Sequence, residues 1–390
     1  MDGPVRVLHV VGAMNRAGIE TWLMNVLRRM DRTRLRMDFL VHTQRAADYD
    51  EEIQDLGGRI FRVGAPKRSV GYAGALRKAL GEAGAADVLH VHEHYWSGMI
   101  LAVARRGPFG LRVVHSHNDT RAQEDWRHPA RAAYAAAMRR LIRRHADVGL
   151  AASEAAALCL FGEQWRERGN VRVLYCGTDF SAFRVAGDRR AFRASLGLPE
   201  GATVVAHVGR FEWQKNHALI VDIAGWLRER GGHHFLLVGE GSLRAEVERR
   251  VRAAGLEGMF TLLGSRADVP ELLCLAADVF LFPSWHEGLG LALVEAQAAG
   301  LPTVHSRRIP VEADLFPEAN LRLAPEAGAA EWGAAVMQAA DRPRTPADER
   351  VEQLMRSRFS LVSSFAELEA LYLDRCGRQA TACGSKQVVR

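Results

Sequence analysis

The alternation of short apolar runs with amphipathic helical stretches is the feature of this chain that most constrains its fold. The first series of runs lies at residues 6–11, 36–41, 87–91, 111–115 and 146–151. A second series lies at residues 203–208, 235–239, 259–264, 279–282 and 302–305. Repeated strand–helix–strand order places the strands parallel, with helices over both faces of each sheet. The sequence therefore predicts an α/β protein with two doubly wound domains.

The 390 residues are enough for two domains with a core each. We predict an N-terminal domain at residues 1–180 and a C-terminal domain at residues 190–347. The apolar spacing over residues 348–375 predicts a helical segment that docks back on the first domain, and residues 376–390 are typical of a frayed tail.

The composition limits the cellular setting and the partners. A net charge of +6 suits an anionic ligand, but it does not distinguish a small anion from a membrane surface or nucleic acid. The sequence has no window of about 18 apolar residues for a membrane span, and its N-terminus lacks the basic start of a signal peptide. The five cysteines show no metal-ligand spacing. We expect a cytoplasmic protein that does not bind nucleic acid.

Two carboxylates, Glu287 and Glu295, flank the start of a predicted helix that follows the strand-like run 279–282. The turn between strand and helix contains Gly288 and Gly290, so backbone N–H groups can approach one point, as phosphate binding requires. The carboxylates suit neutral hydroxyl groups on either side of that phosphate. A nucleotide-sugar has this layout. The alternative role for Glu287 is helix capping.

Two cations follow the run 203–208, the first strand of the second predicted domain. Arg210 and Lys215 stand five residues apart, and Lys215 is one of only four lysines among 52 basic residues. Open parallel sheets bind ligands beyond the carboxyl ends of their strands. A departing diphosphate needs fixed positive charge there. The alternative is that both are ordinary surface cations.

The ordered set of motifs resembles family 4 glycosyltransferases with the GT-B fold, in which two Rossmann-like domains face a cleft. The segments that carry this resemblance are Gly209-Arg210 with Lys215, Gly239-Glu-Gly241, Gly264-Ser-Arg266, Pro283-Ser284 with Glu287 and Glu295, and Ala299-Gly300-Leu-Pro302. The similarity to the bacterial exopolysaccharide-type branch lies in Gly18-Ile-Glu20-Thr, Tyr49-Asp-Glu-Glu, His115-Ser-His117-Asn and His207-Val-Gly-Arg-Phe.

The resemblance implies that the domain at residues 1–180 is the acceptor side and that the domain at residues 190–347 binds the nucleotide-sugar. It also implies a role for each matching residue in the donor site. Glu295 would hold the ribose hydroxyls, and Glu287 the hydroxyls of the transferred sugar. Arg210 and Lys215 would neutralise the departing diphosphate, which would also meet the backbone amides of Gly288, Leu289, Gly290 and Leu291.

The remaining positions of the resemblance lie in other loops. Gly18 would approach the diphosphate from the first domain, and Arg266 lies where the family holds the nucleotide base. His117 is the predicted catalytic-pocket histidine, with His115 as the alternative. Three departures from the family pattern are Cys176 at the interdomain join, Ala17 before Gly18, and residues 307–312 in place of a glycine-rich segment.

These roles imply a retaining, metal-independent transfer of a sugar from a nucleotide-diphosphate donor, a UDP-sugar by expectation, to an acceptor hydroxyl. No cofactor is required. The expected acceptor is an exopolysaccharide or other cell-surface glycan, free or lipid-linked. Alternatives are a small natural product as acceptor, or a GT-B sugar-nucleotide epimerase or phosphorylase. A nicotinamide-dependent oxidoreductase is disfavoured because Met14 and Ala17 stand where its glycine fingerprint needs glycines.

Three further motifs have an ordinary structural explanation. His90, His92 and His94 alternate as metal ligands would, but no carboxylate or cysteine set supports a metal. Asp48-Tyr-Asp50 fits the DxD pattern that metal-dependent GT-A transferases use for a divalent cation, but its acidic segment suits the first turn of a helix. The basic helix at 131–145 could contact anionic lipid at the inner face of a membrane, although a solvated helix face explains it as well.

Overall fold

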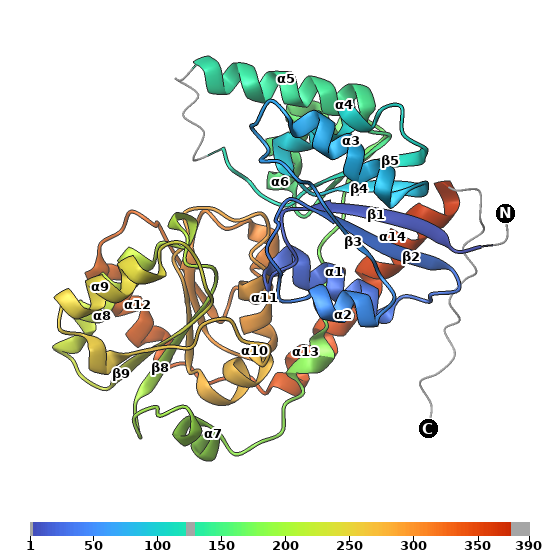
Figure 1. Cartoon of the computed structure of the whole chain (residues 1–390). Coiled ribbons are helices and arrows are strands. Elements are labelled where there is room, and N and C mark those ends of the chain that lie inside the picture. Colours follow the sequence, from blue (N-terminus) through green and yellow to red (C-terminus); the bar gives the residue numbers. More distant parts are fainter. Residues whose placement is uncertain (1–2, 122–128, 376–390) are drawn as a thin grey trace, which may run out of the picture.

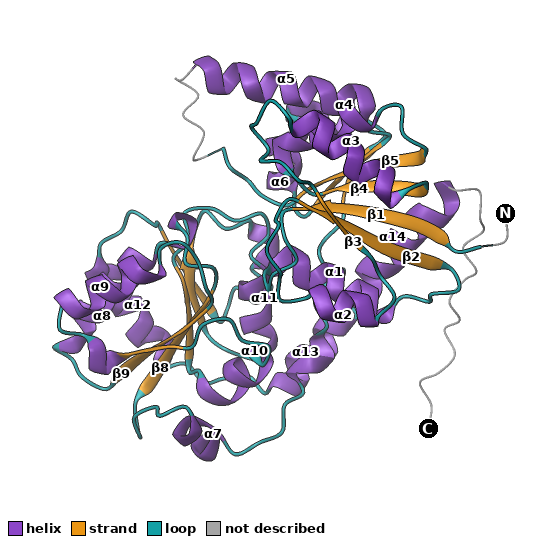
Figure 2. Ribbon diagram, viewed as in Figure 1, coloured by secondary structure: helices purple, strands orange, loops and turns teal. Residues whose placement is uncertain are grey.

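The computed structural model describes residues 3–121 and 129–375 and forms two α/β lobes joined through the middle of the chain (Figure 1). The predicted tail at 376–390 lies outside the described residues. In each lobe helices flank a sheet (Figure 2). The strands of both sheets pair in parallel in every pairing that joins them. The prediction of two doubly wound domains is confirmed.

The first sheet has the order β3-β2-β1-β4-β5-β6-β7. Its strands are β1 (Val5–Val11), β2 (Leu35–Val41), β3 (Ile60–Arg62), β4 (Ala86–Val91), β5 (Phe109–Ser116), β6 (Val148–Ala151) and β7 (Val171–Val173). The second sheet has the order β10-β9-β8-β11-β12-β13. Its strands are β8 (Thr203–Val208), β9 (His233–Val238), β10 (Phe260–Leu262), β11 (Val279–Phe282), β12 (Thr303–Ser306) and β13 (Asn320–Leu323).

Helices connect these strands. In the first lobe they are α1 (Gly18–Arg29), α2 (Asp50–Asp55), α3 (Tyr72–Ala83), α4 (Ser97–Ala104), α5 (Pro129–His145) and α6 (Glu154–Phe161). Those that follow are α7 (Arg189–Ser195), α8 (His217–Arg228), α9 (Arg244–Ala253), α10 (Val269–Glu271), α11 (Leu291–Ala298), α12 (Ala329–Ala340), α13 (Ala347–Met355) and α14 (Leu361–Arg375). No helix of the described residues is long and apolar enough to span a membrane.

Each sheet has one topological switch point, where neighbouring strands lead their helices in opposite directions. In the first sheet it lies between β1 and β4, and in the second between β8 and β11. The loops at the carboxyl ends of these strands leave a crevice, which is where open α/β sheets bind ligands. The fold therefore predicts ligand binding at the loops after β1, β4, β8 and β11.

The C-terminal segment differs from the single docking helix that the sequence predicts. Helix α13 buries Val351 and Leu354 in the core of the second lobe, whereas α14 buries Leu368 and Tyr372 in the core of the first. The helical stretch is interrupted at residues 356–360, and Phe359 joins the second-lobe core. Only α14 docks on the first domain (Figure 1).

The sequence also missed three strands, β3, β7 and β13. They contain three or four residues each and stand at the outer positions of the two sheets. Edge strands pack against fewer neighbours, so a short, mixed sequence such as Val171–Val173 gives little periodic signal. None of the three contributes to the switch points.

Candidate active site

A buried ion pair joins the two loops at the switch point of the second sheet. Lys215, in the loop after β8, donates through Nζ to Oε1 of Glu287 at 2.7 Å. Gln214 Nε2 donates to the other carboxylate oxygen at 3.2 Å. The Lys215 and Glu287 side chains are only 15% and 8% exposed. Each charge is thereby compensated where burial would otherwise oppose it.

Helix α11 begins directly after Glu287 through a turn that requires glycine. Gly290, at the N-cap, has a φ of +91°, a left-handed conformation that favours glycine. A Cβ on Gly288 would lie 1.6 Å from the backbone oxygen of His117, which belongs to the first lobe. Ser153 of the first lobe also donates a hydrogen bond to the Gly288 carbonyl. The turn is thus in direct contact with the first lobe.

The start of α1 faces the start of α11 across this contact. A Cβ on Gly18 would lie 3.2 Å from the Leu291 side chain. The N-termini of two helices, α1 and α11, therefore converge at one place (Figure 1). Unpaired N–H groups and the helix dipoles make such a place favourable for an anion.

Two further carboxylates belong to the helices that converge here, α1 and α11. Glu295, on α11, is half-buried, and burial raises its pKa to about 7, an effect that Lys215 opposes. Glu20, on α1, is also half-buried, and burial likewise raises its pKa to about 7 while Arg210 opposes the change. Arg210 itself is exposed and makes no salt bridge within the described residues. Its charge is therefore available to a ligand.

Arg266 lies further out. Its guanidinium forms an ion pair with Asp268 at 2.6 Å and is about one-third exposed. It follows β10, the outermost strand on that side of the sheet, and β9 separates β10 from β8. Within the described residues, Arg266 makes no hydrogen bond or ion pair with Lys215 or Glu287.

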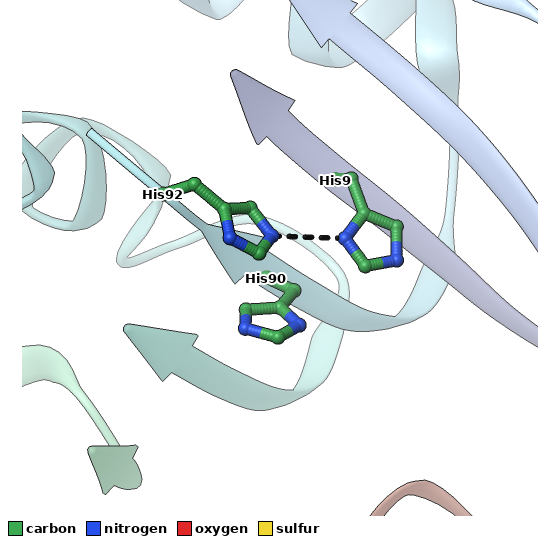
Figure 3. Close-up of side chains that lie close together, drawn as sticks. All are labelled: His9, His90 and His92. Carbon is green, nitrogen blue, oxygen red and sulfur yellow. Dashed lines mark hydrogen bonds between the residues drawn. The ribbon is translucent and has the colours of Figure 1, made fainter. Parts of the chain in front are cut away.

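The histidine predicted in the first lobe belongs to a buried cluster of five, which we call the histidine cluster: His9, His90, His92, His115 and His117. His9 Nδ1 lies 3.0 Å from His92 Nε2, and His92 Nδ1 lies 2.8 Å from His117 Nε2. Figure 3 shows how His9, His90 and His92 converge from β1 and the end of β4. Burial lowers the pKa of His92 and His117 well below the ordinary value. Both rings are neutral at pH 7.

His117 is the member of the cluster that reaches the cleft, through its backbone oxygen opposite Gly288. Its ring turns inward, with Nδ1 3.5 Å from the Cys176 sulfur. His115 is fully buried and stacks on the His90 ring at an interplanar angle of 7°. His117 is thus closer to the predicted site than His115.

Sequence reasoning missed the place of His9 in this cluster. His9 and His90 are partners in the parallel register of β1 and β4, so their side chains point to the same face. The only available signal was that both histidines interrupt otherwise apolar strands. His94 does not continue the alternation of His90 and His92, because the chain turns at His94 into a short helix with a φ of +47°.

The two metal-like motifs of the sequence have different surroundings in the structure. Asp48 accepts a hydrogen bond from the Arg16 backbone, and Asp50 pairs with Arg62 at 2.5 Å, so the two carboxylates serve different partners. Two histidine triplets, His9-His90-His92 and His92-His115-His117, bring ligand atoms within 4.8 Å of one another. The described residues supply these triplets with no carboxylate.

The basic helix α5 packs on α4 through Ala135, Met138 and Ile142. Arg139 turns inward and donates to the Tyr95 hydroxyl at 2.9 Å. Arg140, Arg143 and Arg144 remain exposed. One of the four clustered arginines is therefore structural.

Two parallel α/β lobes whose strand ends face a common cleft define the GT-B class of glycosyltransferase. A family described as glycosyl transferases group 1 matches residues 188–350, and a glycosyl transferase 4-like domain matches residues 17–177. EpsF of Bacillus subtilis strain 168, assigned as a glycosyltransferase, is 36% identical over 314 residues, which cover 79% of this chain and 81% of EpsF. The chain belongs to the group 1 glycosyltransferases. Its resemblance to the exopolysaccharide type is confirmed.

Solved structures share the fold. Anabaena HepE, in complex with UDP and glucose, aligns with a TM-score of 0.73 at 19% identity and covers 94% of this chain and 99% of its own. Sucrose-phosphate synthase from Thermosynechococcus elongatus aligns with a TM-score of 0.76 at 19% identity. The alignment covers 94% of this chain and 98% of the synthase chain.

Proposed function

We propose that this glycosyltransferase is a retaining, metal-independent family 4 enzyme that transfers a sugar from a UDP-sugar to a hydroxyl of a growing exopolysaccharide or other cell-surface glycan. The observation that carries the proposal is the Lys215–Glu287 pair, buried at the second switch point beside the converging starts of α1 and α11. HepE, with its bound UDP and glucose, supports the donor class.

In this proposal the second lobe holds the donor from ribose to sugar. Glu295 accepts the ribose hydroxyls, and Arg266 lies beside the base. The amides of Gly288, Leu289, Gly290 and Leu291, with Gly18 opposite, hold the diphosphate. The Glu287 carboxylate has lone pairs left after its bonds to Lys215 and Gln214, so it can also accept from the transferred sugar.

The chemistry needs no protein nucleophile. The acceptor hydroxyl approaches the face from which the diphosphate departs, and a donor phosphate oxygen takes its proton. Lys215 and Arg210 stabilise the negative charge that grows on the leaving group. A neutral His117, with its carbonyl at the cleft, does not oppose positive charge at the anomeric carbon as an imidazolium would.

A panel of nucleotide-sugars tests the donor site. Ligands that bind the folded state raise the melting temperature by mass action. We expect UDP-glucose or another UDP-sugar to raise it and NAD⁺ to leave it unchanged. Product analysis then separates transfer from epimerisation or phosphorolysis. Stabilisation by NAD⁺ alone would contradict the proposal.

Metal independence has its own test. Because Arg210 and Lys215 supply the positive charge, we expect turnover in EDTA to equal turnover in Mg²⁺. Loss of turnover in EDTA that Mg²⁺ restores would show that a divalent cation takes part.

A further inference from the structure

Two stacked tryptophans form an aromatic surface on the second lobe. The Trp213 side chain is 55% exposed, and its ring stacks on that of Trp285 with centroids 5.7 Å apart and an interplanar angle of 9°. A single exposed apolar residue is ordinary, but two aromatic rings that form one contiguous surface can mark a binding site. One face of Trp213 is covered by Trp285, and more than half of the residue remains open.

The pair stands at the second switch point, beside the proposed donor site. Trp213 lies two residues before Lys215 in the loop after β8, and Trp285 lies two residues before Glu287 in the loop after β11. The Trp285 backbone N–H donates to the Gln214 carbonyl at 2.8 Å, which ties the two loops together. The aromatic surface is therefore held at the rim of the reacting position.

Hydrogen bonds hold both loops where they carry the pair. Asn216 adopts a left-handed φ of +56°, which asparagine tolerates better than most residues, and its Nδ2 donates to the Pro283 carbonyl at 3.3 Å. On the other side, the Glu212 carboxylate accepts from the Ser242 hydroxyl at 2.9 Å. A ligand would thus meet an aromatic face that needs little ordering.

The chemistry around the pair suits a sugar ring. The C–H groups on one face of a pyranose carry partial positive charge and pack on the electron-rich face of an aromatic ring. Arg308, 5.6 Å from the Trp285 ring centre, adds N–H donors for hydroxyl groups. Arg308 belongs to segment 307–312, where the chain departs from the glycine-rich pattern of its family.

We propose that Trp213 and Trp285 form a platform that holds a pyranose ring of the glycan acceptor next to Glu287. This inference rests on the proposed function, because it places an acceptor beside the donor site. A glycan fits better than a lipid surface, because the ion pair with Glu326 offsets the charge of Arg308 toward anionic headgroups but leaves other guanidinium N–H groups to donate to neutral hydroxyl groups.

Saturation-transfer NMR tests the platform with the purified full chain, UDP, and disaccharides of glucose, galactose and N-acetylglucosamine. We expect transfer from the protein to be strongest at the C–H protons of one sugar face. Trp213→Ala should reduce the saccharide signal about fivefold or more, on the scale of one lost aromatic contact. Trp213→Phe, which keeps an aromatic face, should retain most of it.

The UDP signals in the same samples separate the two proposals. Without UDP signals in the wild type, the proposed donor site fails. With UDP signals present, saccharide signals that are absent, or equal in wild type and Trp213→Ala, overturn the platform. Tyr134→Ala, which removes an exposed aromatic ring from the first lobe, is the matched control and should change nothing. Sedimentation with phosphatidylglycerol vesicles that depends on Trp213 would show a membrane surface instead and also overturn the platform.

Discussion

The histidine cluster of the first lobe and the Lys215–Glu287 pair of the second lobe are both buried at the cleft. They differ in whether their side chains remain charged. The histidine cluster of the first lobe gives up charge, because burial lowers the pKa of its members and leaves the rings neutral. The Lys215–Glu287 pair of the second lobe keeps both charges at 2.7 Å from each other. Burial is thus met by loss of charge in the first group and by pairing in the second.

The difference assigns different tasks to the two lobes. A charged pair can stabilise a diphosphate whose charge changes during the reaction. A neutral cluster can shape the opposite wall, and it does not compete for that diphosphate. The comparison thus predicts that charge changes affect chemistry in the second lobe and stability in the first.

The largest expected effect comes from breaking the charged pair. Lys215→Ala and Glu287→Gln should each lower sugar transfer by about 100-fold or more, the scale of lost transition-state electrostatics. The measurement is UDP release with an active acceptor, with the melting temperature as a check on folding. Lys78→Ala, at a lysine whose side chain is 80% exposed on α3, is the matched control. Near-normal transfer by both site variants would remove them from the mechanism.

The contact between the lobes can be broken at one glycine. A Cβ on Gly288 would collide with the His117 carbonyl, so Gly288→Ala should hold the lobes apart and lower transfer by about tenfold, because misplacement by about 1 Å is costly. Small-angle scattering should show a larger radius of gyration. Gly81→Ala on α3, where a Cβ meets nothing within 4 Å, should change neither quantity. An unchanged radius would show that the contact does not set the closed arrangement.

The histidine cluster predicts a loss of stability in acid. The folded-state pKa of His9 and of His115 is lowered to about 3, below the ordinary 6.5, so the unfolded chain binds more protons below pH 6.5. Stability is fully present above pH 6.5 and falls as the pH drops toward 3, by about 1.4 kcal/mol per pH unit and group. Urea midpoints measured from pH 7.5 to 5 test this. His115→Leu should flatten the dependence, and an unaltered slope would contradict the account.

The smallest effect concerns Glu295, whose pKa is raised to about 7. Its carboxylate becomes ionised as the pH rises through 7, and an ionised acceptor makes the stronger hydrogen bond to a ribose hydroxyl. UDP affinity should rise about fivefold from pH 6 to 8, and Glu295→Gln should abolish the rise. The same shift costs stability as pH rises from 4.5 to 7, because the unfolded chain ionises first. Titration calorimetry with UDP from about pH 6 to 8 measures the rise in affinity. Glu20→Gln is the control for the other carboxylate with a pKa of about 7.

The parts of the fold and of the candidate site that could be predicted from the sequence are those with local sequence patterns. The central strands and the turn before α11 have short-range signatures, namely apolar runs and closely spaced glycines, and the structure has them where expected. Lys215 and Glu287 could be paired because residues after adjacent parallel strands meet at one edge.

The rest depends on contacts between residues far apart in the chain. His9 joins the cluster only through the register of β1 with β4, and Ser153 meets Gly288 only when the lobes pack. The break between α13 and α14 separates a helix that packs in the core of the second lobe from one that packs in the core of the first. No local sequence pattern indicates that the Trp213 side chain is exposed. Such features need the three-dimensional packing.

A structure of the enzyme with a UDP-sugar would locate the diphosphate. We expect the diphosphate between Gly18 and the amides of residues 288–291, with Lys215 within hydrogen-bonding distance and Glu287 on the sugar. A diphosphate bound in the first lobe, or one that lies away from Lys215, would contradict it.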